Sequence, residues 1–154
     1  MTYPRSASMI LTSSLLMFGL MYLNTYQLSH VWFSETRAYK TVLMGATMAV
    51  VMLGFMWKHY LRRSTNISIV AVAALAFAGS LWLVRSQATV ADVSWMKAMI
   101  PHHSIAILTS ERASISDPRV RELAEGIIEA QRREIAQMEA LIEDIERANE
   151  RRSD

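Results

Sequence analysis

The sequence predicts an all-α protein in which three transmembrane helices are followed by an antiparallel helical hairpin. Three observations lead to this prediction: long uncharged apolar runs early in the chain, apolar residues at helical spacing late in it, and an uneven distribution of charge. Residues 1–90 carry seven Lys or Arg and one acidic residue, a net charge of +6, whereas residues 91–154 carry nine basic and thirteen acidic residues, a net charge of −4. We therefore predict a membrane domain at 1–88 and a helical hairpin domain at 89–154.

The composition argues against several functions. A net charge of +2 and a pI near 9.2 would suit a nucleic-acid-binding protein, but the basic residues flank apolar segments instead of forming one stripe, so we expect no nucleic-acid partner. The absence of cysteine excludes disulfides, thiolate metal sites and a cysteine nucleophile. No catalytic triad or phosphate-binding loop is visible, so we do not expect an enzyme.

The three predicted spans lie at about 8–26, 41–60 and 64–85. Each contains an uncharged apolar run of about the length that crosses a bilayer core. The run in the second span is the shortest, and interfacial Lys and Tyr side chains at its ends extend it. The third ends in Trp82 and Arg85, an interfacial aromatic followed by a cation. The lipid bilayer is therefore a predicted partner.

The short loops predict the orientation. Lys58, Arg62 and Arg63 crowd the connection between the second and third spans, and the positive-inside rule places such a connection in the cytoplasm. We therefore predict a multi-pass protein of the cell (inner) membrane with a cytoplasmic N-terminus. The hairpin domain would then be extracytoplasmic, in the periplasm if the cell has one, and residues 27–38 would lie on the same side.

Two helices are predicted in the hairpin domain. Thr89, with Asp92 three residues later, forms a capping-box variant that starts the first helix, and Pro101 should kink this helix because proline has no amide proton. Asp117 is the expected N-cap of the second helix, with Pro118 at its first position. The two helices are expected at about 90–113 and 118–149.

The segment from Met96 to His103 combines two thioethers and two imidazoles. On a helix, Met96, Met99 and His103 are spaced i, i+3 and i+7 and share one face. Thioether and imidazole ligands without thiolate suit Cu(I) or Ag(I), whereas Zn(II) or a di-iron centre would require more carboxylates. The alternative interpretation is that these side chains only pack a helix interface.

Gln131 and Glu134 interrupt the apolar stripe of the second predicted helix. An inward carboxylate is unfavourable unless it is paired, hydrogen-bonded or metal-bound, so Glu134 requires a partner or a function. If the hairpin turns midway between its helices, facing residue numbers sum to about 230. This register places Met99 opposite Gln131 and Met96 opposite Glu134. We assign Asp92, Gln131 and Glu134 to a polar network around the candidate ligands.

The apolar stripes of the hairpin are too wide for two helices to bury alone. We therefore predict a homodimer in which two hairpins complete a four-helix bundle. The alternative is that the stripe packs on residues 27–38 or on another partner.

Two separated motifs resemble the domain-of-unknown-function 305 family. The family pattern is Met-Ile-Pro-His-His followed by Ala-Ile, and then Gln-x-x-Glu-Ile-x-x-Met on a second helix. The matching residues are Met99-Ile100-Pro101-His102-His103, Ala106-Ile107 and Gln131-Arg132-Arg133-Glu134-Ile135-Ala136-Gln137-Met138. The resemblance covers about residues 90–145, and the predicted spans lie outside it.

The resemblance implies a ferritin-like, exported helical domain, and because some members bind copper or silver through Met and His, it implies such a site here. Carried over by position, the implied ligands are Met99, His102, His103 and Met138. Helical geometry adds Met96 as a fifth candidate. The family usually has another Met where this chain has Thr109, so one thioether is missing.

The first hypothesis is thus a membrane-anchored, extracytoplasmic protein that binds Cu(I) or Ag(I) for copper homeostasis or tolerance, together with a copper-handling partner of unknown identity. The second is a structural or regulatory membrane protein whose hairpin mediates dimerisation or partner docking without metal. A third, a ferritin-like oxidase, would require a bound pair of iron ions.

Overall fold

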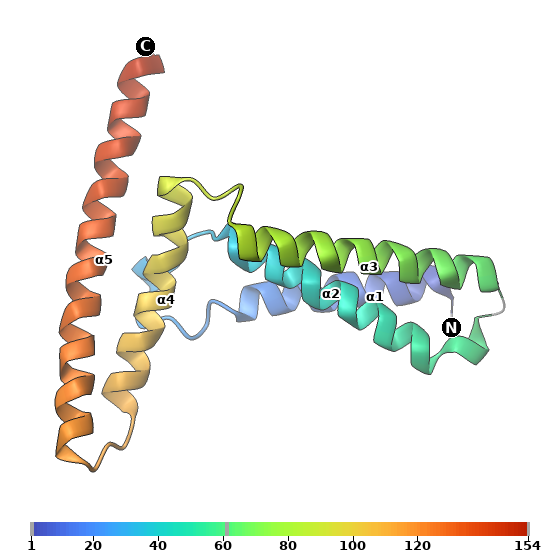
Figure 1. The fold of residues 1–154 in the computed structure, drawn as a ribbon, viewed down its shortest axis with the longest axis horizontal. Helices are drawn as coiled ribbons and strands as arrows, with labels where there is room; N and C mark the ends of the chain where they lie inside the picture. The colour runs from blue at the N-terminus through green and yellow to red at the C-terminus, as the bar shows by residue number, and fades with distance from the viewer. Residues whose placement is uncertain (1, 61, 154) are drawn as a thin grey trace. The chain divides into compact units, whose positions relative to one another are not determined.

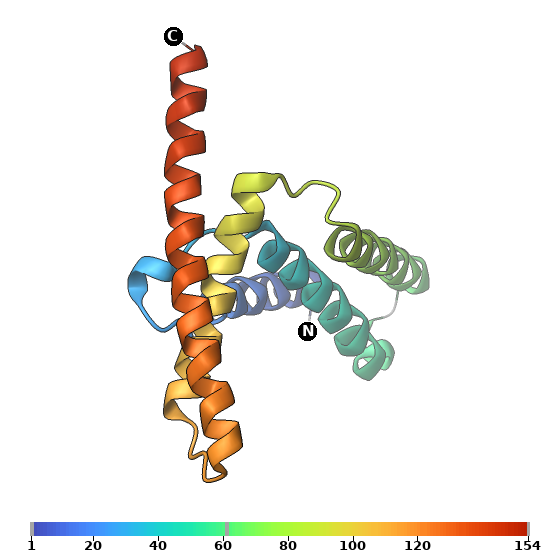
Figure 2. The ribbon, with the colours of Figure 1, turned by 60° about the vertical axis from the view of Figure 1, so that its left-hand side comes forward.

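The computed structural model describes residues 2–60 and 62–153, and every regular element in this part of the chain is helical. The all-α prediction is therefore confirmed. Figure 1 shows the elements in chain order, and Figure 2 shows the same ribbon after a rotation. The elements are α1 (Tyr3–Leu20), η1 (Leu28–His30), α2 (Glu35–Phe55), η2 (Trp57–His59), α3 (Arg63–Ser86), α4 (Asp92–Arg112) and α5 (Pro118–Ser153).

The chain forms two compact units. The first comprises the chain up to Met21 together with Glu35–Thr89, and the second comprises Tyr22–Ser34 together with the chain from Val90 onward. The segment Tyr22–Ser34 thus belongs with the hairpin, although it lies between α1 and α2 in sequence. We call this segment the strap.

In the first unit, α2 and α3 pack along each other and α1 packs against α2. Within the described residues, α2 and α3 are long and apolar enough to cross a membrane, whereas α1 does not meet the same criteria. The prediction of three spans is therefore corrected to two candidate spans. The predicted first span, 8–26, fails because α1 ends at Leu20 and its first turns contain Pro4 and Arg5.

A side chain from α2 helps to end α1. Arg37 donates a hydrogen bond from Nη1 to the carbonyl oxygen of Met21, at 2.8 Å, and Met21 is the C-cap residue of α1. A guanidinium at a helix C-terminus satisfies a free carbonyl and complements the helix dipole. The second unit then begins at Tyr22.

The α1–α2 contact depends on a small residue. A Cβ atom built on Gly45 would lie 2.8 Å from Ser14 Oγ. The two helices therefore approach closely because Gly45 has no side chain, which is the usual role of small residues between apolar helices.

Polar side chains join the start of α1 to the start of α3. Tyr3 donates its hydroxyl to Asn66 Oδ1 at 2.7 Å, and Asn66 Nδ2 donates to the carbonyl of Tyr60 at 3.2 Å. The hydroxyls of Ser6 and Tyr60 are also hydrogen-bonded. Asn66 is 1% exposed, so its amide is buried with its polar groups satisfied.

The second unit contains the predicted hairpin, and α4 and α5 lie side by side in both views (Figures 1 and 2). The predicted capping box does not form: α4 starts at Asp92, and its N-cap is Ala91 without a side-chain bond. Thr89 instead lies hydrogen-bonded to the hydroxyl of Tyr39 at 2.7 Å. The second cap is as predicted, since Asp117 Oδ1 accepts the backbone N–H of Arg119 at 2.9 Å and α5 begins at the next residue after Asp117.

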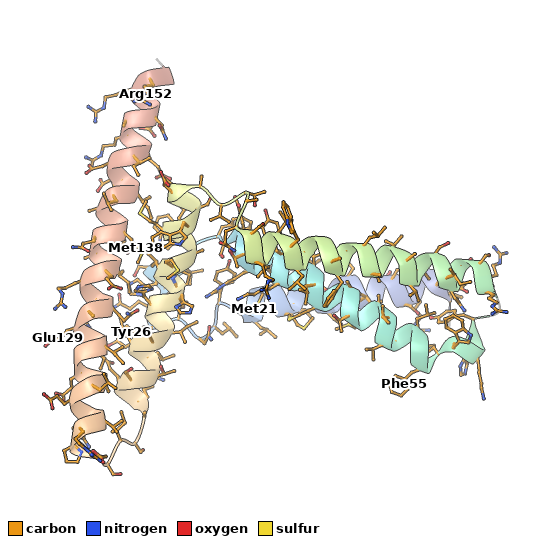
Figure 3. All side chains as sticks on the ribbon, viewed as in Figure 1. Met21, Tyr26, Phe55, Glu129, Met138 and Arg152 are labelled. Atoms are coloured by element: carbon orange, nitrogen blue, oxygen red, sulfur yellow. The ribbon has the colours of Figure 1, made fainter. Side chains whose placement is uncertain are left out.

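The core of this unit lies between α4 and α5. Its buried members are Met96, Ile100, Ile107, Ile135, Met138 and Ile142, with Met99, Ile128, Ile145, Val93, Tyr26 and Trp32 packed around them. In Figure 3, Met138 lies on the side of α5 that faces α4, and Glu129 lies on the opposite side. The 3.6-residue periodicity of both helices thus produces one shared apolar seam.

The register of the hairpin differs from the prediction. Glu134 was expected opposite Met96, but its carboxylate contacts His103, and Lys97 pairs with Glu146. The reason is the connection between the helices. Ala113 is extended (φ −68°, ψ 137°), so the chain continues past the end of α4 before it reverses, and the first turn of α5 lies beyond that end (Figure 1).

Candidate metal-binding site

Three of the five candidate ligands are methionines that meet in the seam of the hairpin. Met96 on α4 and Met138 on α5 are 5% and 7% exposed and belong to the same buried cluster, and Met99 packs against it. The spacing of Met96 and Met99 predicted that these two side chains share one face of α4. The fold brings the Met138 thioether of α5 to them. All three lie among aliphatic side chains, where a Met is also an ordinary filler of space.

His103 lies beside this cluster and uses both ring nitrogens. Its Nδ1 is 3.0 Å from the carbonyl oxygen of Met99, and its Nε2 is 2.6 Å from Oε2 of Glu134. The His103 side chain is 11% exposed, whereas that of Glu134 is 50% exposed. Glu134 thus has His103 as a partner, and its half-exposed carboxylate lies at the edge of the seam, whereas the apolar pattern predicted it on the inward face.

The two bonds determine what the imidazole can do. Both nitrogens face oxygen acceptors, so both bonds form fully when each nitrogen carries a proton. A neutral imidazole whose Nδ1–H donates to the Met99 carbonyl would present a free lone pair at Nε2. This arrangement, with one nitrogen tied to a backbone carbonyl, is how many metal-ligating histidines are oriented.

His102 does not join this cluster. It is exposed on α4, and its ring centroid lies 6.2 Å from that of His103, at an interplanar angle of 63°. Thr109 is seven residues further along α4 and therefore on the same face as His102. It is also exposed, and its hydroxyl donates to its own helix, at the carbonyls of Ile105 and Ala106. A Met at this position would thus face away from Met96 and Met138.

The other predicted members of the polar network are dispersed. Asp92 is exposed in the first turn of α4, and eleven residues of helix separate it from His103 by about 16 Å. Gln131 is partly exposed on α5 and lines a shallow groove with Leu123 and Ile127. Only Glu134 of the three is bonded to a candidate ligand.

In the described residues, no three His, Asp or Glu side chains come together in a way that would hold a metal ion. The donors that gather in the seam are the thioethers of Met96, Met99 and Met138, beside the His103 imidazole. Thioether with imidazole is a soft, uncharged donor set, and it fits Cu(I) or Ag(I) better than Zn(II) or iron.

The strap provides polar contacts that sequence reasoning missed. Tyr26 donates its backbone N–H to Ser104 Oγ at 2.6 Å, and His30 Nδ1 lies 3.0 Å from the same oxygen. Ser104 is fully buried, at 0% exposure, and follows His103 directly. The sequence signal that could have revealed the strap is the polar pair Asn24 and Thr25. This pair interrupts the first apolar run shortly after α1 ends at Leu20.

The Lys97 side chain makes a second contact between the strap and the hairpin. Lys97 Nζ lies 5.2 Å from the ring centroid of Trp32 and 2.6 Å from Oε1 of Glu146. Cation–π and ion-pair contacts from one ammonium thus join the strap, α4 and α5. Of residues 27–38, His30 and Trp32 contact α4, at Ser104 and Lys97.

The fold and the site together define a class: an all-helical protein with two candidate membrane spans and a Met- and His-bearing helical hairpin. Residues 81–151 match a family model described as "Domain of unknown function (DUF305)". The chain is also 31% identical, over 108 residues, to "Uncharacterized protein L153" of Acanthamoeba polyphaga mimivirus, and the match covers 69% of each protein. The chain belongs to this family. No solved structure matches it.

Both matches extend beyond the hairpin. The family model begins within α3, at residue 81. The 108 matched residues of the viral relative exceed the length of the hairpin, which begins at Asp92. The similarity therefore reaches into the apolar helices that precede the hairpin.

Proposed function

We propose that this protein is a membrane-anchored, extracytoplasmic metal-binding protein that captures Cu(I) or Ag(I) for copper homeostasis or tolerance, without catalysis of its own. The observation that carries the proposal is the meeting of Met96 and Met138, from two different helices, in one buried cluster beside Met99 and His103. Met99 and His103 belong to the first family motif, and Met138 belongs to the second.

Anchoring follows from the apolar helices α2 and α3. The basic residues Lys58, Arg62 and Arg63 between them favour a cytoplasmic position for their connection. With two spans, the start of α2 and the hairpin that follows α3 would then both be extracytoplasmic, in a protein of the inner membrane of a cell with two membranes. The ligands would meet copper outside the cytoplasm.

In the proposed site, His103 Nε2 and the sulfur atoms of Met96, Met99 and Met138 would hold the ion. The Met99 carbonyl keeps Nδ1 engaged, so Nε2 is the nitrogen left for the ion. Glu134 would have to release Nε2, and because its side chain is half exposed it can turn into solvent. Neutral ligands suit a monovalent ion because no extra buried charge accompanies it. His102 would remain on the surface, outside this set.

Competition titration of the full-length protein in detergent tests the proposal. Ag(I) binding, measured by calorimetry, is compared between the wild type, His103→Gln and Met138→Leu. The Leu variant keeps an apolar side chain of similar volume in the seam, so its effect reports the sulfur. We expect each variant to bind Ag(I) at least about tenfold more weakly.

The matched control is Met17→Leu, a methionine of α1 outside the hairpin, which should bind like the wild type. If the wild type binds no more tightly than the double variant His103→Gln with Met138→Leu, metal binding at this site is contradicted. Equal loss in the Met17→Leu variant would also contradict it, because a thioether outside the hairpin would then belong to the binding region.

A second candidate function, dimerisation or docking without metal, is favoured by one observation on α5. Part of its apolar stripe stays uncovered: Leu123 is 63% exposed and Leu141 is 52% exposed. A second hairpin seated on this stripe would complete a four-helix bundle.

The chain has no cysteine, so Leu123→Cys places a single thiol on the uncovered stripe. Oxidation in native membranes should give a disulfide-linked dimer if two stripes face each other. Ser116→Cys, exposed in the α4–α5 connection, is the matched control. Monomer in both cases would contradict the homodimer.

A further inference from the structure

The strap has two chemically different faces. One face is bonded to the hairpin through the Tyr26 amide and His30, both on Ser104. The other face is apolar and uncovered: Leu28 is 90% exposed, Leu23 77%, Phe33 65% and Val31 43%. Four large apolar side chains exposed within one short segment are more than the single scattered residues that are normal on a protein surface.

No charged side chain accompanies this apolar face. The strap Tyr22–Ser34 contains no Asp, Glu, Lys or Arg, and its one histidine, His30, is buried against α4. Its Tyr26 and Trp32 side chains pack on the hairpin core, so the exposed side chains of the strap are mainly aliphatic. A surface that met only water, or a charged protein partner, would not require this composition.

The covalent chain supplies a second argument. The strap is followed directly by α2, which begins at Glu35 and is one of the two helices long and apolar enough to cross a membrane. Its distal end is thus covalently adjacent to the polar end of a candidate span. An apolar face in that position is within reach of the headgroup and acyl boundary, where buried apolar area gives binding energy.

We propose that the exposed aliphatic side chains of the strap, Leu23, Leu28 and Val31, insert into the outer lipid boundary of the membrane. The strap then joins two partners: a lipid surface on one side and α4 on the other, at Ser104, next to His103. This fixes the metal-binding hairpin to the bilayer surface independently of any metal. The inference rests on the membrane anchoring proposed above but not on copper binding.

Single-cysteine labelling of the full chain in phosphatidylcholine and phosphatidylglycerol vesicles tests the inference, because the natural chain has no cysteine. A bimane fluorophore is attached at Leu28→Cys and its quenching is compared with two lipids, one carrying a nitroxide near the headgroup and one deep in the acyl region, and with aqueous iodide. The control is Ser116→Cys, which is exposed in the α4–α5 connection of the same unit.

We expect the shallow nitroxide to quench the label at position 28 at least about twofold more strongly than the label at 116, and iodide to show the reverse order. Equal iodide quenching at both positions would show that the strap faces water and would overturn the inference. A label at 28 that neither quencher reaches would overturn it too, because protein would then cover the strap.

A third label separates this inference from membrane anchoring itself. Leu75 on α3 is 75% exposed, and Leu75→Cys should be quenched by the deep nitroxide if α3 crosses the bilayer. Deep quenching at 75 without shallow quenching at 28 refutes the strap inference alone. Absence of quenching at 75 refutes the anchoring on which it rests.

Discussion

The hydroxyl oxygen of Ser104 accepts the backbone N–H of Tyr26 at 2.6 Å, a bond between residues 78 positions apart in the chain. His30 lies on the same oxygen. Because Ser104 directly follows His103, this bond attaches the strap to the part of α4 that carries the candidate metal ligand. Because the strap belongs to the hairpin unit, the chain passes between the two units three times, after Met21, Ser34 and Thr89.

Ser104→Ala should detach the strap. The hydroxyl is fully buried, and its loss leaves the Tyr26 amide without its acceptor, which destabilises the unit by about 1–3 kcal/mol. Amide hydrogen exchange at Tyr26 should accelerate, and the midpoint of thermal unfolding should fall. Ser116→Ala, at an exposed serine of the α4–α5 connection, should change neither, and unchanged Tyr26 exchange in Ser104→Ala would contradict the role assigned to this bond.

Glu134→Gln should show whether the Glu134 carboxylate only contacts His103 or also binds the metal ion. The substitution replaces a charge-assisted bond to His103 with a neutral one, and because the Glu134 side chain is 50% exposed the loss of stability should be about 1 kcal/mol or less. Ag(I) should bind as tightly as to the wild type or more tightly, since the competitor at Nε2 is weakened. A tenfold loss of Ag(I) affinity, seen by calorimetry, would instead make the carboxylate a ligand.

Gly45→Ala tests the close approach of α1 and α2. The added Cβ would meet Ser14 Oγ at 2.8 Å, so the serine must rotate or the helices must separate, at a cost of about 1–3 kcal/mol. The thermal midpoint in detergent should fall, and the double variant with Ser14→Ala should recover most of the loss because the clashing oxygen is gone. Gly54→Ala, which has open space around it, should behave like the wild type.

Asp117 predicts a pH dependence at the start of α5. The hydrogen bond from the Arg119 side chain, followed by the backbone amides of Arg119 and Val120, holds the pKa of Asp117 below its ordinary value of 3.8. A carboxyl whose folded pKa is lowered contributes stability above its unfolded pKa and loses it as the pH falls through the folded pKa. The difference in thermal midpoint between the wild type and Asp117→Asn should therefore be full at neutral pH and vanish in acid below the ordinary value.

Asp117→Ala provides the comparison for that experiment. Asn retains an oxygen that can accept the Arg119 amide, whereas Ala removes the cap at every pH. We expect the Ala variant to unfold at a lower temperature than the wild type even in acid, as followed by circular dichroism. A pH-independent difference between the wild type and Asp117→Asn would contradict the proposed electrostatic contribution.

Local features of the sequence were sufficient for much of the fold. The uncharged runs predicted α2 and α3, and the turn residues Asp117 and Pro118 predicted the start of α5, because span length, capping and proline geometry depend on neighbouring residues only. The apolar periodicity predicted that Met96 and Met138 face a common seam. These features act over one or two helical turns, so a single sequence reveals them.

The tertiary structure decided the pairing of distant residues. The contact of His103 with Glu134 depends on how far the α4–α5 connection runs before reversing, and a shift of a few residues is not encoded in the apolar pattern of either helix. The end of α1 and the docking of the strap on Ser104 depend on hydrogen bonds across 16 and 78 residues. Such bonds exist only once the helices are in place, which is why the chain alone suggested a span continuing to residue 26, where the structure ends α1 at Leu20 and begins the strap at Tyr22.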